Sequence, residues 1–214
     1  MRLLLTGGAG LLGKYLKPAL RKMGWEVYAP SHRDLDVTKK IRKVRVDLVI
    51  HAAAYTNVAL TQHMRLKAYR VNVEGTENLA CAYWNTPFVY ISTEYARRAV
   101  NFYGETKAYG ELMVALTCSR YLIIRTLFKP TPYPWDVAFT NQYTQGDYVD
   151  VIAPLIAEKV REWYNKGAQS GLTYVGTGRK TMYELARRTR PDVKGNFVED
   201  IEREKGVKIP KDYQ

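Results

Sequence analysis

Cysteine, long apolar runs and acidic side chains are scarce in this sequence. The two cysteines among 214 residues, Cys81 and Cys118, show neither metal-ligand spacing nor a disulfide framework. We therefore expect no bound metal, and we expect a reducing, cytoplasmic setting. The N-terminal run MRLLLTGG is too short for a signal peptide or a membrane span, and no later apolar run is long enough, so we expect no membrane contact.

The shortage of acidic residues leaves the chain strongly basic. There are 33 lysines and arginines against 21 acidic residues, a formal net charge of +12. Such a surplus attracts polyanions, including nucleic acids, phosphorylated cofactors and anionic membranes. The densest basic run, KKIRKVR (39–45), has no aromatic side chain on which a base could stack. We interpret it as a solvated helix face beside a strand, and we do not expect a nucleic-acid partner.

Apolar runs bounded by turn residues alternate with stretches of helical periodicity in the first part of the chain. Near-continuous apolar runs are typical of strands in parallel sheets, whose two faces are both buried. The pattern predicts an α/β fold of the Rossmann type, with a doubly wound parallel sheet. The expected strands are 2–6, 26–29, 47–53, 88–92 and 121–126, and the expected helices between them are 14–23, 61–84 and 103–116.

This alternation breaks after Arg125. The segment FKPTPYPWD (128–136) has three prolines and is expected to be a loop. Helical periodicity returns near 148–165 and is followed by a short strand, 172–175, and by helices near 181–188 and 195–205. We divide the chain into an NAD(P)-binding domain, 1–127, and a small, abbreviated C-terminal substrate-binding region, 128–214. We expect the late strand and helix to return to the main sheet.

The first expected strand runs directly into the glycine-rich stretch TGGAGLLGKYL. Gly7 permits a sharp turn, Gly10 lets the backbone approach a pyrophosphate, and Gly13 allows close packing of the helix on the strand. The free amides at the helix start attract phosphate groups. The pattern predicts a dinucleotide site, with Leu11 and Leu12 beside the glycines, although a tight turn without a ligand would give the same letters.

The second expected strand leads into YAPSHRDLDV. A site that prefers NAD carries a carboxylate at this strand end, to bind the ribose hydroxyls. Ser31 stands near that place and Arg33 follows it, which favours a 2′-phosphate and therefore NADP(H), with NAD(H) as the alternative. Asp34 either reaches a hydroxyl or pairs with Arg33. Asp36 and Val37 are expected on the adenine side of the cofactor.

Several motifs occur in an order and at spacings that belong to a known family. They are TGGAGLLG (6–13), LDVT (35–38), HAAAYTNV (51–58), VNVEGTENLA (71–80), YISTEY (90–95), YGETKAYGE (103–111) and IIRT (123–126). Weaker matches follow in GDYVDVIAPLI (146–156) and TYVGTGRKTMYELA (173–186). The chain resembles the extended short-chain dehydrogenase/reductase family, and within it the dTDP-4-dehydrorhamnose reductases.

The resemblance implies that Thr93, Tyr103 and Lys107 form a catalytic triad. With 17 tyrosines in the chain, a Tyr-x-x-x-Lys pair has little specificity by itself, and a helix-start tyrosine with a solvated lysine is the alternative. The residue types suit the chemistry, because residues four apart share a helix face. The ammonium group would stabilise a phenolate and hold the nicotinamide ribose, while Tyr103 protonates a substrate oxygen that Thr93 polarises.

The resemblance also implies residues around this triad. Asn72 would anchor the segment against which the cofactor lies, residues 52–54, although a helix cap or a core hydrogen bond would explain Asn72 equally well. Further implied cofactor contacts are Ala52, Ala53, Ala54, Lys107 and Thr126, and implied substrate contacts are Thr93, Tyr103, Phe128 and Asn141.

Two segments are shorter than in typical members of the family, one between Tyr95 and Tyr103 and one between Phe128 and Tyr148. Only Glu94 follows Thr93 as a carboxylate, which disfavours a sugar dehydratase. We expect an NADP-dependent reductase of a nucleotide-linked 4-keto sugar. The alternatives are an NAD(P)-dependent nucleotide-sugar epimerase and a non-catalytic NADP-binding regulatory module, and a homodimer is compatible with each.

Overall fold

The centre of the molecule is a twisted parallel sheet. The structure, a computed structural model, describes residues 1–212. The strand order is β10-β5-β4-β3-β1-β2, which reverses direction on either side of β1 and so confirms the predicted Rossmann-type α/β fold. The strands are β1 (Arg2–Thr6), β2 (Glu26–Tyr28), β3 (Leu48–His51), β4 (Phe88–Thr93), β5 (Tyr121–Thr126) and β10 (Gly171–Tyr174).

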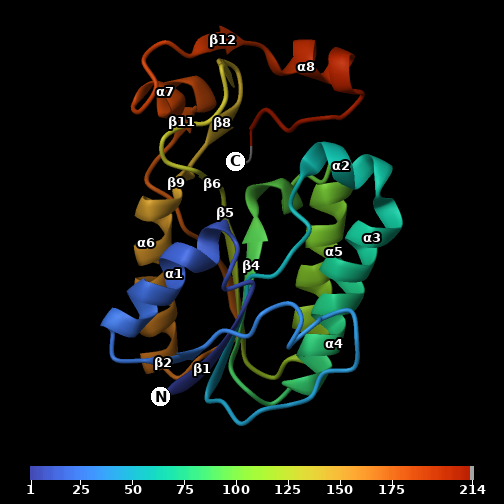
Figure 1. The fold of residues 1–214 in the computed structure, drawn as a ribbon, viewed down its shortest axis with the longest axis vertical. Helices are drawn as coiled ribbons and strands as arrows, with labels where there is room; N and C mark the ends of the chain where they lie inside the picture. Colours follow the sequence, from blue (N-terminus) through green and yellow to red (C-terminus); the bar gives the residue numbers. More distant parts are fainter. Residues whose placement is uncertain (213–214) are drawn as a thin grey trace.

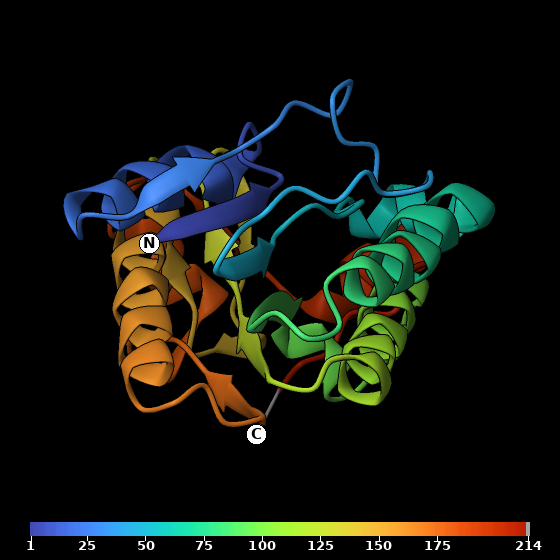
Figure 2. The same ribbon diagram turned by 90° about the horizontal axis from the view of Figure 1, so that it is seen from below.

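Helices cover both faces of the sheet (Figures 1 and 2). One face is covered by α1 (Leu11–Lys22) and α6 (Val149–Asn165), the other by α4 (Gly75–Ala82) and α5 (Phe102–Thr117). The expected helix over 61–84 is broken into α2 (Val58–His63), α3 (Arg65–Tyr69), the π-helical turn η1 (Arg70–Glu74) and α4. Among the described residues, none of the helices is long and apolar enough to cross a membrane.

The strands are apolar along their whole length because both faces are buried. Leu3 and Leu5 point into the core under α1 and α6, and Leu4 between them points into the core under α4 and α5. All three leucines are fully buried. The continuous apolar runs in the sequence therefore follow directly from the two helix layers.

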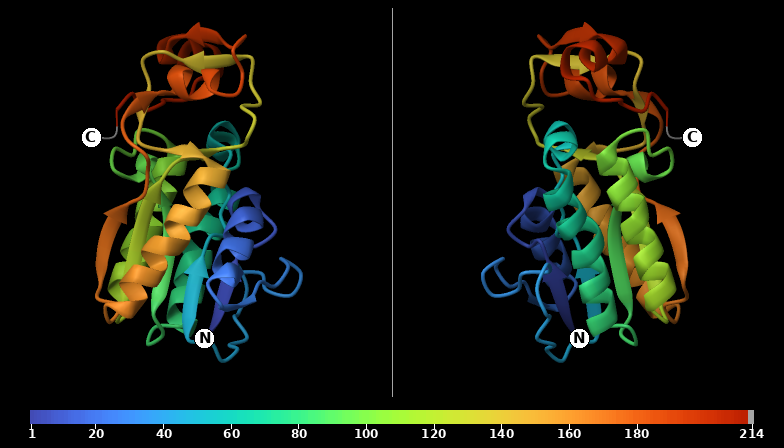
Figure 3. Two further views of the ribbon diagram at one scale, coloured as in Figure 1. Left: turned by 90° about the vertical axis from the view of Figure 1, so that its left-hand side faces the viewer. Right: turned by 90° about the vertical axis from the view of Figure 1, so that its right-hand side faces the viewer.

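A second, smaller part of the chain stands above the carboxyl ends of the strands (Figure 3). Its own apolar cluster includes Leu127, Tyr133, Met182 and Leu185. Between its segments the chain returns to the main sheet through α6 and β10. The elements of this part are β6 (Phe128–Lys129), β7 (Val137–Phe139), β8 (Tyr143–Thr144), β9 (Asp147–Tyr148), β11 (Lys180–Thr181), α7 (Met182–Arg187), β12 (Lys194–Asn196) and α8 (Val198–Lys205).

The basic run 39–45 is not a helix, so that expectation was wrong. Asp36 Oδ1 accepts hydrogen bonds from the backbone N–H and the hydroxyl of Thr38, at 3.0 and 2.8 Å, which forms a turn. Further on, the Tyr83 hydroxyl accepts a hydrogen bond from Val44 N at 3.0 Å and donates one to Val44 O at 3.2 Å. A distant side chain thus satisfies the backbone groups that a helix would have paired.

The close packing of α1 on the first turn gives a test of the fold. A Cβ on Gly13 would lie 2.3 Å from Gly7 O and 2.5 Å from Gly8 Cα, and neither backbone atom can rotate away. We expect Gly13→Ala to lower the free energy of unfolding by about 1–3 kcal/mol in urea denaturation. Gly171→Ala is the control, because a Cβ there meets nothing within 4 Å. Equal stability of the two variants would contradict the packing described.

Candidate functional site

The glycine-rich turn lies at the carboxyl edge of the sheet, between β1 and α1. Gly7 has a φ of 70°, and a Cβ on it would lie 2.7 Å from the backbone of Ala52 and Ala53. Gly10 precedes α1 without a side-chain cap, and the first helical turn has no acidic residue. The first amides of α1 are therefore available to an anionic group. The turn fits a dinucleotide pyrophosphate.

The two leucines at the start of α1 lie differently. Leu12 is 5% exposed and belongs to the core, whereas Leu11 is 37% exposed. Both residues would contact a bound phosphate through their backbone N–H groups, which lie in the first turn of α1.

The segment after β3, which contains Ala52, Ala53 and Ala54, is held by Asn72. Asn72 Oδ1 accepts a hydrogen bond from Tyr55 N at 2.7 Å, and Asn72 Nδ2 donates to Tyr55 O and to Thr106 Oγ1, both at 3.0 Å. Asn72 is 1% exposed and lies in the π-helical turn η1, a distortion frequently found at functional sites. Through these buried hydrogen bonds, Asn72 fixes the position of the segment after β3.

His51 connects Asn72 to the glycine-rich turn. The His51 ring lies between two hydroxyls, with Thr6 Oγ1 2.7 Å from Nδ1 and Thr76 Oγ1 3.1 Å from Nε2. Thr76 in turn donates to the backbone carbonyl of Asn72 at 2.7 Å. Burial, with a smaller effect from Lys107, lowers the pKa of His51 to about 3, so the ring is neutral at pH 7. Sequence reasoning missed His51, although a polar residue ending an apolar strand was a usable signal.

Thr93 and Tyr103 meet at the ends of β4 and α5. Thr93 is the last residue of β4 and pairs in register with Thr126 on β5. Tyr103 lies in the first turn of α5, which Asn101 caps by accepting a hydrogen bond from Gly104 N at 2.9 Å. Burial raises the pKa of Tyr103 above its ordinary value, and a hydrogen bond with Thr93 partly opposes this. The phenol is therefore protonated at neutral pH.

Lys107 lies one turn further along α5 and is buried. Its ammonium group donates a hydrogen bond to Ile91 O at 2.8 Å and lies 4.1 Å from the centroid of the Tyr90 ring. Burial lowers the pKa of Lys107 to about 7, and Glu111 opposes this shift. The buried ammonium takes Ile91 O as an acceptor. The expected interaction with a Tyr103 phenolate stays a prediction.

The other expected contacts are divided between the two parts of the chain. The Thr126 hydroxyl donates to Val175 O at 2.8 Å, and Phe128 packs partly buried against the main core. Asn141 is turned to α8, where its Nδ2 donates to Glu199 Oε2 at 2.8 Å and its Oδ1 accepts from Val198 N at 2.9 Å. The pairing of β7 with β12 brings Asn141 there, so the geometry gives it a structural role.

The C-terminal segment braces the short loop that precedes Tyr103. Gln142 Nε2 donates hydrogen bonds to the Tyr95 hydroxyl at 3.2 Å and to Pro210 O at 3.1 Å. Asn101 Nδ2 donates to Lys208 O at 2.8 Å. Long-range bonds therefore fix the segment between Thr93 and Tyr103 despite its brevity.

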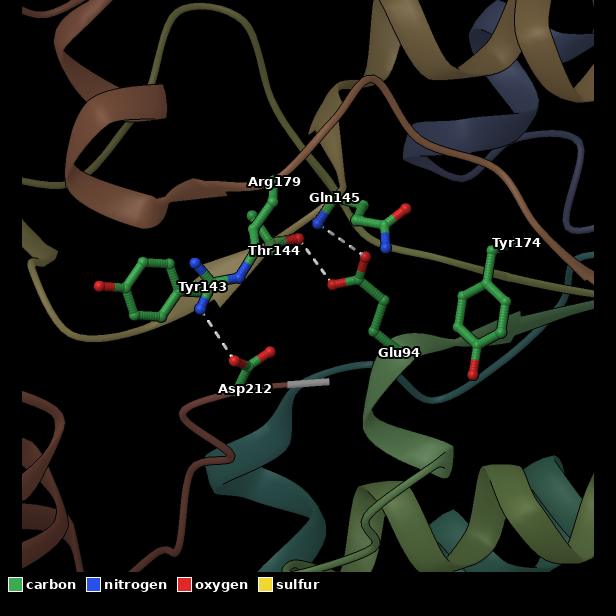
Figure 4. A pocket seen from close by; sticks show the side chains of 7 residues that line it. All are labelled: Glu94, Tyr143, Thr144, Gln145, Tyr174, Arg179 and Asp212. Atoms are coloured by element: carbon green, nitrogen blue, oxygen red, sulfur yellow. Dashed lines mark hydrogen bonds and ion pairs between the residues drawn. The ribbon is translucent and has the colours of Figure 1, made fainter. Parts of the chain in front are cut away.

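Glu94 joins the strand end to the second part of the chain (Figure 4). Its carboxylate accepts hydrogen bonds from the Thr144 hydroxyl at 2.6 Å and from Gln145 N at 3.1 Å. Burial raises the pKa of Glu94, and the Thr144 hydrogen bond opposes the shift. The hollow beside it has a volume of about 10 Å³, room for about one water molecule. Glu94 therefore anchors β8 to the end of β4.

The residues expected at the adenosine ribose lie just beyond β2. The Ser31 hydroxyl donates to Asp34 Oδ2 at 2.6 Å, so Asp34 is engaged with Ser31. Hydrogen bonds from Thr38 lower the pKa of Asp36, and this carboxylate is ionised. Arg33 and Asp36 both line a hollow of about 430 Å³.

Comparison with protein families matches residues 1–129 to the RmlD substrate binding domain. The chain belongs to this family. A curated relative, the dTDP-4-dehydrorhamnose reductase of Mycolicibacterium smegmatis, is 31% identical over 71% of this chain and 54% of its own length. The dTDP-4-keto-6-deoxy-D-glucose reductase of Streptomyces niveus is 33% identical over 88% of this chain and 77% of its own length. The chain thus spans about half the length of the M. smegmatis relative.

A solved structure shares the fold of this RmlD-family chain. The dTDP-4-dehydrorhamnose reductase of Bacillus anthracis, solved in complex with NADP, superimposes with a TM-score of 0.83 at 23% identity, covering 98% of this chain and 88% of that one. The expected resemblance to extended short-chain dehydrogenase/reductases of the dTDP-4-dehydrorhamnose reductase type is confirmed.

The buried charge of Lys107 predicts a pH dependence of stability. The folded-state pKa of about 7 lies below the ordinary value of a lysine, about 10.4. The cost of burying the charge is therefore complete below pH ~7 and falls as the pH rises toward 10.4. We expect Lys107→Met to raise the free energy of unfolding more at pH 6 than at pH 9, by a margin on the order of 2 kcal/mol in urea titrations.

Lys22→Met, a change at an exposed position of α1, is the matched control and should show no such difference between the two pH values. An effect of Lys107→Met that is the same at pH 6 and pH 9 would contradict a buried, charge-carrying Lys107.

Proposed function

We propose that this RmlD-family chain is an NADP-dependent reductase of a nucleotide-linked 4-keto sugar. The observation that carries the proposal is the Tyr103 phenol, which is hydrogen-bonded to Thr93 and carries its proton at neutral pH. It lies at the carboxyl edge of the sheet, the edge at which the glycine-rich turn also lies. The activities after which the M. smegmatis and S. niveus relatives are named support this substrate class.

The cofactor would be held by backbone on one side and by a lysine on the other. The first amides of α1 would bind the pyrophosphate, and the segment Ala52–Ala54, fixed by Asn72, would form a flat wall beside it. Lys107, whose ammonium group bonds Ile91 O in β4, would hold the nicotinamide ribose. The bound dinucleotide supplies a hydride to the carbonyl carbon of the sugar.

The protein's part in the reaction is to protonate the carbonyl oxygen. As that oxygen gains negative charge, Thr93 holds it by a hydrogen bond and Tyr103 donates its hydroxyl proton. An alkoxide is a stronger base than a phenolate, so the transfer is favourable even though burial raises the pKa of Tyr103. Phe128, partly buried at the start of the second part, is proposed to contact the sugar.

The same pKa shift favours a reductase over an epimerase. A 4-epimerase would first need Tyr103 as a base, to remove a proton from a sugar hydroxyl. Burial raises the pKa of Tyr103 and so works against this role in the free protein, whereas it keeps the proton in place for donation.

Tyr103→Phe tests the proposal directly. With NADPH and dTDP-4-dehydrorhamnose, followed by the loss of NADPH absorbance, we expect kcat to fall by about 10²–10⁴-fold because the proton donor is lost. NADP binding should be unchanged. Tyr109→Phe is the matched control, since Tyr109 is on the same helix but 51% exposed, and it should keep wild-type activity.

Other outcomes separate the alternatives. A wild-type chain that consumes no NADPH with any nucleotide keto sugar is not this reductase. Interconversion of two sugars without net NADPH consumption would identify an epimerase. NADP binding without turnover, unaffected by Tyr103→Phe, would identify a non-catalytic module.

A further inference from the structure

A buried ion pair lies between α5 and the sheet. Glu111 on α5 is 7% exposed, and Arg125 on β5 bonds both of its carboxylate oxygens, from Nε to Oε1 at 2.9 Å and from Nη2 to Oε2 at 2.6 Å. The reaction proposed above uses neither residue. Removing two charges from water costs about as much as their attraction returns, so a buried ion pair is weak evidence for stability. A role in the site would explain the pair better.

The ion pair belongs to a series of side-chain hydrogen bonds that crosses three strands. On β4, the Ser92 hydroxyl donates to Glu111 Oε1. On the other side, Arg125 Nη1 donates to the Tyr174 hydroxyl on β10 at 3.0 Å. These bonds hold the Glu111 carboxylate in one position against β4.

The position of this carboxylate is next to Lys107. The two residues are four apart on α5 and therefore share one face of the helix, whereas Glu105, two residues before Lys107, does not. Lys107 Nζ donates to Ile91 O at 2.8 Å, and Glu111 bonds Ser92, the next residue of β4. Burial lowers the pKa of Lys107 to about 7, and Glu111 opposes this shift. Opposite charges are thus fixed at consecutive residues of one strand.

The other titratable groups around Lys107 are neutral or turned away. His51 on β3 is neutral, and burial raises the pKa values of Tyr90 on β4 and Tyr103 on α5, so both phenols are protonated at neutral pH. The charged side chains of α2, α3, η1 and α4, which also pack on α5, are exposed. The Glu94 carboxylate is turned to β8. Within residues 1–212, the buried ion pair is therefore the charged neighbour of the Lys107 ammonium group.

We propose that Glu111 is a positioning residue that keeps Lys107 charged, and that Arg125 limits how strongly it does so. The inference rests on the proposed function, in which Tyr103 becomes a phenolate once it has given its proton to the substrate. A cation held nearby stabilises that negative charge. Because Arg125 binds both oxygens of the same carboxylate, it weakens the attraction that Lys107 experiences.

The protonation of Lys107 can be measured without any turnover. In the full chain with lysine labelled with carbon-13 at Cε, NMR follows the Lys107 signal against pH, and Lys107→Met assigns that signal by its loss. Glu111→Gln should move the midpoint to a pH lower by about one unit or more, because the attracting charge is removed. Arg125→Gln should move the midpoint upward, because the carboxylate loses its cation but can keep a hydrogen-bond donor.

Two controls separate charge from packing. Glu77→Gln makes the same substitution at an exposed position of α4, and Tyr174→Phe removes a partner of Arg125 but no charge. Both should leave the Lys107 midpoint where it is in the wild type. Melting temperatures identify the variants that fold. If Glu111→Gln does not fold, the upward shift expected for Arg125→Gln carries the test.

Opposite shifts in the two variants are the decisive result, since a role in packing alone would not give them. An unchanged midpoint in a folded variant of Glu111 or Arg125, or shifts in the same direction, would overturn the inference. In the reductase assay, kcat/KM should fall as the pH rises through each variant's own Lys107 midpoint. A chain that shows the opposite shifts but oxidises no NADPH keeps the role of Glu111 toward Lys107 and loses only the reductase proposal.

Discussion

The side chain of Asn72 joins the parts of the site that must act together. It bonds both backbone groups of Tyr55 and the hydroxyl of Thr106 on α5. The backbone carbonyl of Asn72 accepts a hydrogen bond from the Thr76 hydroxyl, which also bonds His51. Each buried polar group left unpaired costs about 1–3 kcal/mol. The glycine-rich turn, the wall after β3 and the helix that carries Tyr103 are therefore held in one arrangement by a continuous line of buried hydrogen bonds.

Burial at the same edge also decides which groups carry protons. It keeps His51 neutral, keeps the phenol of Tyr103 protonated, and brings the pKa of Lys107 to about 7. A water-exposed tyrosine would also be protonated at pH 7, so burial matters most for His51 and Lys107, whose ordinary pKa values lie higher. The sheet edge thus offers a proton donor next to a place for a dinucleotide, which is the combination that carbonyl reduction needs.

The parts of the structure that depend on residues close together in the sequence could be predicted from it. The glycine-rich turn and the apolar strands are local patterns, and they led to the correct fold. The conformation of 38–47 depends on Tyr83, which is far along the chain, and the place of Asn141 depends on α8. Likewise, helix periodicity predicts that Lys107 and Tyr103 share one face of the helix. It does not predict that the ammonium group donates a hydrogen bond to Ile91 O.

The central claim is that this chain delivers a hydride to a sugar carbonyl whose oxygen Tyr103 protonates. Label transfer from NADPH with deuterium at both C4 positions to a nucleotide-linked 4-keto sugar, read by mass spectrometry and NMR of the product, tests it most directly. The account predicts one deuterium at C4 of the reduced sugar for each NADP⁺ formed. An unlabelled product, or an isomerised sugar with the NADPH unchanged, would contradict it.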